Sequence, residues 1–249
     1  MNSLISSELL KLRTTRAPYV ALAVVLVWAV AGPVLVALNP AGATVPDLEP
    51  ASLAELMRGP ARLAGGAMLL IGLLASAGEF RHGTVLTTRL AEPRSTRVLL
   101  ARAAALTGVG VAAGVLLGIV AGGAGAILLA THDVSVQPLA NGVPRVALLV
   151  PALMGLHAAL GVAIGSLLRN TAAAVGVTLM WALVVEGILP LVLQQPAMGQ
   201  WLPSGAVSQM LAAHTEPGQL PPFAAGALLA GYAAALFASS VALDRAREL

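Results

Sequence analysis

The 249-residue chain has no cysteine, a single lysine and few charged or aromatic side chains. Without cysteine there are no disulfides, no thiolate metal sites and no cysteine nucleophile. The lysine, Lys11, follows a leucine and has no glycine loop before it, so the P-loop motif G-x-x-x-x-G-K-[ST] is missing. Charged residues make up 10% of the chain, against about 25% in soluble domains. Because so few charges cannot cover a surface that faces water, we expect an all-α integral membrane protein.

Other classes of protein are excluded by pattern. The net charge is +3, but the arginines are spread between apolar segments with no interleaved aromatics, which does not favour nucleic-acid binding. There is no H-E-x-x-H motif and no aspartate cluster. His157 and Ser166 are nine positions apart, which places them on opposite faces of one helix, where they cannot pair as a dyad. We therefore expect no enzyme activity, no metal and no cofactor in this chain.

The apolar segments predict the membrane spans, since a helix needs about 20 apolar residues to cross a bilayer. Six segments qualify, with an amphipathic stretch at 1–16 before them: 17–38, 63–80, 98–130, 146–168, 172–193 and 223–243. The second is short, and the third is longer than a span, so we expect the third to begin in water.

The basic residues predict the orientation, because arginine and lysine accumulate in cytoplasmic loops. With the N-terminus inside, eleven of them fall in inside segments, and the outside segments hold only Arg58, Arg62 and Arg145. We therefore expect both termini in the cytoplasm and a multi-pass protein of the cell (plasma) membrane. The segment 81–97 is then a cytoplasmic loop, and 194–222 is extracellular.

Glycines at a spacing of four predict a close helix contact. Gly110, Gly114, Gly118 and Gly122 lie in the third span, and the pair Gly161 and Gly165 repeats the spacing in the fourth. Residues four apart share a helix face, and small residues allow membrane helices to approach closely. The contact could form within one protomer or between two.

Two ionisable residues that lie well inside spans are candidates for function. Glu186 lies toward the outer end of the fifth span and precedes Gly187 and Pro190, where we expect the helix to break. Its carboxylate either lines a gate or path, or is a structural acid that accepts backbone N–H bonds of a re-entrant segment. His157, near the middle of the fourth span, either relays protons or touches substrate, or donates a hydrogen bond across a helix interface.

The cytoplasmic loop contains a short helix with a clear start and end. Gly83 ends the preceding helix, Thr84 is suited to an N-cap, and Pro93 stops the new helix. Within it Leu90 shares a face with Arg89. Such a short amphipathic helix either lies on lipid or docks into a partner.

The order of residues in this loop resembles a known family. The pattern Glu79-x-Arg81-x-Gly83-Thr84, followed by Leu90, Pro93 and Arg97, resembles the loop between helices two and three of ABC-2 type transporter permeases. Arg102 could supply the basic residue that follows in that family. The stretch 1–16 looks like the family's connecting helix, and "WLP" at 201–203 looks like part of its extracellular re-entrant region.

The resemblance implies a function for the whole chain. The loop would be the coupling helix that inserts into a separate ABC ATPase subunit, which binds ATP and Mg²⁺. Two permeases, identical or related, would form the translocation path of an exporter within the membrane lipid. The coupling residues would be Glu79, Arg81, Gly83, Thr84, Arg89, Leu90, Pro93 and Arg97. The alternatives are a small ATP-independent secondary transporter and a non-transporting membrane partner protein.

Overall fold

The part of the chain that the structure describes is all-helical. The computed structural model describes residues 2–14, 17–37, 52–81, 83, 90, 92, 95–131, 142–192, 194–212, 215 and 217–248. The α-helices are α1 (Asn2–Thr14), α2 (Ala17–Ala37), α3 (Ser52–Arg81), α5 (Ser95–Thr131), α6 (Val143–Leu168), α7 (Thr171–Met180), α8 (Glu186–Val192), α9 (Pro203–Met210) and α10 (Pro222–Glu248). A π-helix, η2 (Trp181–Val185), joins α7 to α8, and a 3₁₀-helix, η3 (Pro196–Trp201), precedes α9.

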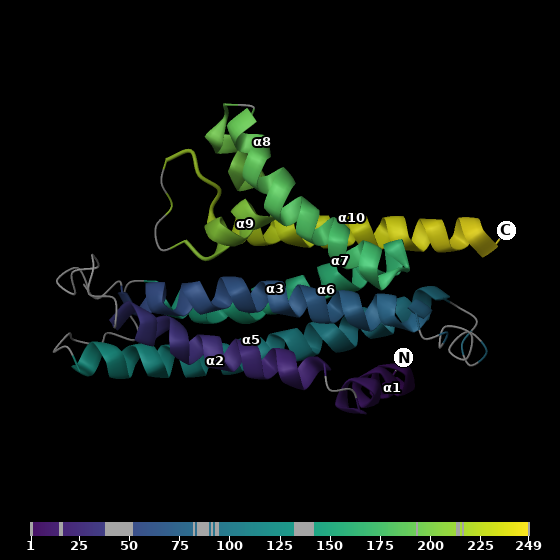
Figure 1. Ribbon diagram of the computed structural model, residues 1–249, viewed down its shortest axis with the longest axis horizontal. Coiled ribbons are helices and arrows are strands. Elements are labelled where there is room, and N and C mark those ends of the chain that lie inside the picture. The colour runs from purple at the N-terminus through teal and green to yellow at the C-terminus, as the bar shows by residue number, and fades with distance from the viewer. Residues whose placement is uncertain are drawn as a thin grey trace.

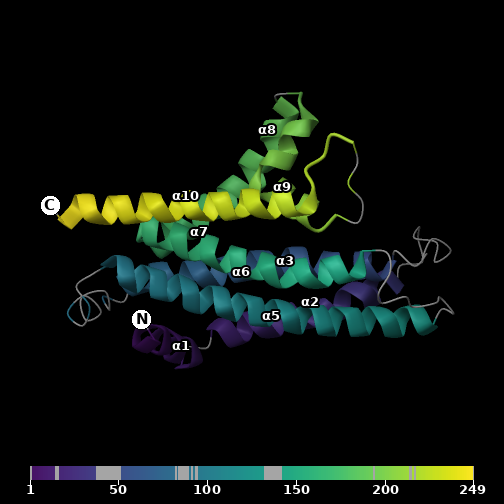
Figure 2. The same cartoon turned by 180° about the vertical axis from the view of Figure 1, so that it is seen from behind.

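The long helices lie nearly parallel in layers. In Figure 1, α3 and α6 form the middle layer, with α2 and α5 on one side and α10 on the other, and Figure 2 shows the same order from behind. Helix α1, the end of α3, the start of α5 and the end of α10 all lie at one end of the bundle. We call this the terminal end, and we call the other end, where α3 and α6 begin, the opposite end.

Five helices among the described residues are long and apolar enough to cross a membrane. Their candidate spans are Leu53–Arg81, Thr96–Thr131, Val143–Leu168, Thr171–Val192 and Pro222–Asp244. Helix α2 covers the first predicted span, but its apolar stretch Leu22–Val34 is shorter than a full crossing. A multi-pass membrane protein is therefore supported by length and composition, and the sixth span stays a prediction.

Helix α3 differs from the predicted second span because it begins at Ser52 instead of Leu63. Its first turns contain charged residues, so the sequence did not predict them to be part of a membrane span. They are nevertheless amphipathic: Leu53, Leu56 and Met57 are buried in the core at helical spacing, and such a stripe favours continuing the helix.

The glycines bring helices into close contact, but only part of the predicted stripe does so. A Cβ on Gly110 would lie 2.6 Å from the Met154 carbonyl oxygen, and one on Gly114 would lie 2.5 Å from Pro151 Cα, both on α6. A Cβ on Gly118 or Gly122 would instead lie nearest to the flexible Met57 side chain, at 3.9 Å and 3.6 Å. The stripe is thus tight against α6 in its first half and loose in its second.

The glycine pair of α6 packs against α3. A Cβ on Gly165 would lie 2.5 Å from the Leu73 carbonyl oxygen, and one on Gly161 would overlap the Leu69 carbonyl. Because backbone atoms cannot move aside as a side-chain end can, these glycines fix the spacing of the central helix pair.

The fifth apolar segment stands apart from the bundle. Helices α7, η2 and α8 lean away from the other layers (Figure 1), and no residue from Val175 to Val192 is buried. We call the segment from Thr171 to Val192 the α7–α8 arm. Its helix does not break at Gly187 or Pro190 as expected, but continues to Val192. The irregularity precedes Glu186, whose N–H bonds to the Trp181 carbonyl, the wide i to i−5 turn of a π-helix.

Candidate functional site

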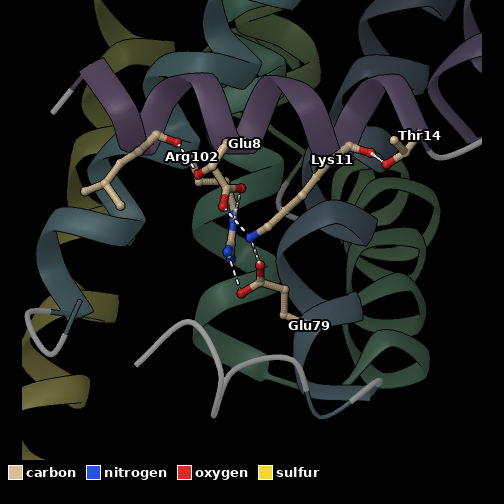
Figure 3. A network of polar contacts seen from close by, with 7 residues as sticks. Glu8, Lys11, Thr14, Glu79 and Arg102 are labelled. Carbon is tan, nitrogen blue, oxygen red and sulfur yellow. Dashed lines mark hydrogen bonds and ion pairs between the residues drawn. The ribbon is translucent and has the colours of Figure 1, made fainter. Parts of the chain in front are cut away.

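Four charged side chains form a closed ring at the terminal end. Glu8 and Lys11 come from α1, Glu79 from the last turn of α3, and Arg102 from α5 (Figure 3). The Lys11 ammonium lies 2.6 Å from Glu8 Oε1 and 2.8 Å from Glu79 Oε1. The Arg102 guanidinium lies 3.0 Å from Glu8 Oε2 and 2.5 Å from Glu79 Oε2. Each cation therefore bridges both carboxylates, and we call these residues the ionic ring.

The ionic ring is largely shielded from water. Arg102 is 4% exposed and Glu8 is 8% exposed, whereas nearly half of the Lys11 side chain remains accessible. A buried ion pair is stable only when nearly every charge has a partner, because desolvation of each ion costs several kcal/mol. Two positive and two negative charges balance here, so α1 can rest on the ends of α3 and α5 without leaving a buried charge unpaired.

The pKa values of the two α1 residues reflect this pairing. Burial on its own raises the pKa of Glu8, but Arg102 and Lys11 together hold it below its ordinary value of 4.5. Burial on its own lowers the pKa of Lys11, but Glu79 and Glu8 hold it above its ordinary value of 10.5. Both shifts favour the charged forms of Glu8 and Lys11.

The next residue of α3, Phe80, connects the same turn to Arg169, at the corner between α6 and α7. The Arg169 guanidinium lies 5.2 Å from the centre of the Phe80 ring and pairs with Asp244 near the end of α10. Arg169 has φ 52 at the corner between α6 and α7, and its N–H bonds to the Gly165 carbonyl. The last turn of α3 is therefore linked both to α1 and α5 and to the α6–α7 corner and α10.

The predicted coupling residues have different surroundings. Glu79 points into the ionic ring. Arg81 ends α3 and is exposed, and Gly83 is exposed with φ 68, as a glycine just past a helix end allows. Leu90 is 83% exposed, and Arg97 is exposed in the first turn of α5. Thr84, Arg89 and Pro93 lie outside the described residues.

Glu186, the first residue of α8, caps the start of α9. Its Oε2 accepts a 2.6 Å hydrogen bond from the backbone N–H of Ser204, in the first turn of α9. A carboxylate at that position also interacts favourably with the helix dipole. This geometry is the one expected of a structural acid that accepts backbone N–H bonds.

The segment between α8 and α10 is held by further polar contacts. The Gln200 side chain accepts from the Leu220 N–H at 2.9 Å, and the Tyr232 hydroxyl donates to the Trp201 carbonyl at 2.7 Å. A Cβ on Gly205 would overlap the Gly199 carbonyl. The chain is thus tightly folded between η3 and α9, and this fold positions Ser204 for Glu186.

His157 is buried in α6 and bonds within its own helix. Its Nδ1 lies 3.0 Å from the Leu153 carbonyl oxygen, four residues earlier. Since a carbonyl can only accept, Nδ1 carries the hydrogen. The ring packs against Gly65 of α3, where a Cβ would lie 3.3 Å from His157 Cε1. The side chain thus fills the α3–α6 contact, and the bond it forms does not cross to another helix as expected.

Sequence reasoning did not find three members of the ionic ring. Glu8 and Lys11 are three residues apart in the amphipathic N-terminal stretch, which places them on one helix face. Arg102 lies inside the predicted third span, and a charged residue there signals a buried partner. That signal could have identified Arg102, whereas its pairing with α1 depends on the tertiary arrangement.

Among the described residues, no group of three histidine, aspartate or glutamate side chains is placed to hold a metal ion. The chain matches no protein-family model, no curated protein and no solved structure.

Proposed function

We propose that the chain is the permease subunit of an ATP-driven ABC-2 type exporter. In this proposal both termini are cytoplasmic, the protein lies in the plasma membrane, and a separate ATPase subunit binds ATP and Mg²⁺. Two permeases, identical or related, form the translocation path. The observation that carries the proposal is the double attachment of the last turn of α3, through Glu79 and Phe80.

A coupling loop needs a stiff connection to the helices that it moves. The loop that resembles the family's coupling helix follows directly after this turn of α3. A push on the loop would therefore reach α1 and α5 through the ionic ring and α10 through Arg169 and Asp244. The exposure of Leu90, at 83%, leaves an apolar side chain available for docking into an ATPase cleft.

Two further features support the proposal. The ends of the chain and the loop-bearing end of α3 share the terminal end of the bundle (Figure 2), as the distribution of arginine and lysine requires of a cytoplasmic side. The α7–α8 arm has no buried residue beyond Ala174, so its apolar faces are available to a second permease or to lipid.

The test is a charge placed on the docking face. The permease is purified from its own membranes with its bound proteins, and Mg²⁺-dependent ATP hydrolysis of the preparation is measured. We expect Leu90→Asp to reduce both the co-purified ATPase and the hydrolysis rate by about tenfold or more, because a charge in an apolar contact costs at least about 1.4 kcal/mol.

The matched control is Ala246→Asp, which adds the same charge at an exposed position of α10 at the terminal end. It should leave hydrolysis unchanged. Equal activity of Leu90→Asp and Ala246→Asp would contradict docking through this loop. A complete lack of ATPase in the wild-type preparation would favour the secondary transporter or the non-transporting partner.

A further inference from the structure

The arginines predicted for the outer segments gather in one place. Arg58 and Arg62 are one turn apart on α3, and Arg145 lies in the first turn of α6, which packs along α3. The charges of Arg62 and Arg145 both act on Arg58. Three like charges close together repel one another, so their gathering at the opposite end of the bundle needs an explanation.

Arg58 has donors that no described residue satisfies. It is 6% exposed, and its Nη1 pairs with Glu55, one turn earlier. Its Nε and Nη2 are buried and have no hydrogen-bond acceptor among the described residues. These two atoms form the side-on edge of the guanidinium, the edge that binds a carboxylate or a phosphate with two parallel hydrogen bonds.

The surrounding charges favour an anion. Within this group Glu55 is the acid paired to Arg58, and its side chain is mostly exposed. Arg145 donates to the Ala212 carbonyl, which holds its guanidinium near the first turn of α6. Arg62 is exposed, so its guanidinium is open to an anion that comes to this end of the bundle.

The position along α3 fits the membrane surface. With 30 residues at about 1.5 Å each, α3 is about 45 Å long, whereas the hydrocarbon core of a bilayer is about 30 Å thick. The helix is therefore longer than the hydrocarbon core, and its charged first turns are the part suited to the headgroup layer, where lipid phosphates lie.

We propose that Arg58, Arg62 and Arg145 form a binding site for a phosphate group at the opposite end of the bundle, with the side-on edge of Arg58 as the bidentate donor. The phosphate belongs either to a lipid headgroup or to a phosphorylated solute. The site does not depend on the exporter function, since it rests on the arginines alone.

Thermal unfolding of the purified chain in neutral detergent tests the proposal. Phosphatidylglycerol is titrated against diacylglycerol, which has the same chains and no phosphate, and inorganic phosphate is titrated against chloride at equal ionic strength. We expect phosphatidylglycerol to raise the unfolding midpoint of the wild type. A midpoint that rises with inorganic phosphate as well identifies a site open to solutes, and a response to the lipid alone identifies a headgroup site.

The variants connect the response to the guanidinium. Arg58→Lys keeps the charge but removes the side-on edge, so the apparent affinity should fall about tenfold. Arg62→Gln should weaken it several-fold, whereas Arg97→Gln, an exposed arginine at the terminal end, should not change it. An unchanged response in Arg58→Lys, or an equal response to diacylglycerol, would overturn the proposal.

Arg58→Met separates binding from a structural role. Without phosphate this variant should be at least as stable as the wild type, because it removes buried donors that have no acceptor, and its response to phosphatidylglycerol should be lost. A Met variant that is less stable and responds to the lipid as the wild type does would show that Arg58 is structural.

Discussion

Arg102 and Arg58 are both buried, and their helices place them at opposite ends of the bundle. Arg102 contacts two carboxylates that also share a lysine, so every charge of the ionic ring has an opposite charge beside it, although Arg102 Nη2 forms its ion pair without a hydrogen bond. Arg58 contacts one exposed carboxylate and keeps two buried donors without an acceptor. A buried arginine can therefore hold helices together at one end of the bundle and keep free donors for a ligand at the other.

The largest expected effect comes from breaking the ionic ring. Arg102→Leu removes one cation and leaves Glu8 and Glu79 with only Lys11, so we expect a loss of about 3–5 kcal/mol in the free energy of unfolding. Chemical unfolding in detergent measures it. The control is Arg97→Leu, which removes an exposed arginine from the same helix and should cost less than about 0.5 kcal/mol. Similar losses in the two variants would mean that the ring adds no stability.

A smaller effect is expected from Glu186, the acid that caps α9. Glu186→Gln keeps one acceptor for the Ser204 N–H but removes the charge, so we expect a loss of about 1 kcal/mol. Ser204→Ala keeps the N–H and should leave stability unchanged. Transport measured on the same purified variants separates the two roles: a Gln variant of wild-type stability that does not transport would identify a gate, and one with lower stability and normal activity per folded molecule would identify a structural acid.

The smallest effect is the pH dependence of the ionic ring. Because the pKa of Glu8 is lowered in the folded protein, its contribution to stability is complete above about pH 4.5 and is lost as the pH falls through the folded-state pKa. The raised pKa of Lys11 preserves its contribution up to about pH 10.5, and that contribution disappears as the pH rises through the folded-state value.

Unfolding at a series of pH values compares the wild type with Glu8→Gln. The stability difference between them should be constant near neutral pH and should shrink on acidification below about pH 4.5. A difference that persists unchanged at low pH would mean that the Glu8 charge contributes nothing.

Much of the fold was predictable because it follows from local composition. Apolar segments of span length became helices in the structure, and Gly83 follows the end of α3 as expected. The start of α3 was missed because its first turns are amphipathic and read as polar. The glycine stripe was treated as uniform, but its close contact with the α6 backbone is limited to Gly110 and Gly114, and the Met57 side chain of α3 faces Gly118 and Gly122.

The candidate site was less predictable because charges pair across long sequence separations. Glu79 was singled out by the loop pattern, but its partners Lys11 and Arg102 come from two other helices. No spacing rule within a helix links these positions, and only the packing of α1 and α3 against α5 brings them together. The same holds for Glu186, whose partner Ser204 lies beyond a turn whose shape the sequence did not specify.

The wide turn before Glu186 amounts to one extra residue in an otherwise regular helix. A π-helical turn of this kind is equivalent to a single-residue insertion, and each residue of an α-helix turns the chain by about 100°. Removing that residue would rotate α8 by about the same angle and carry the Glu186 carboxylate away from the Ser204 N–H. The bond to Ser204 therefore requires a fixed number of residues between Thr171 and Glu186. This holds although the arm has no buried residue beyond Ala174.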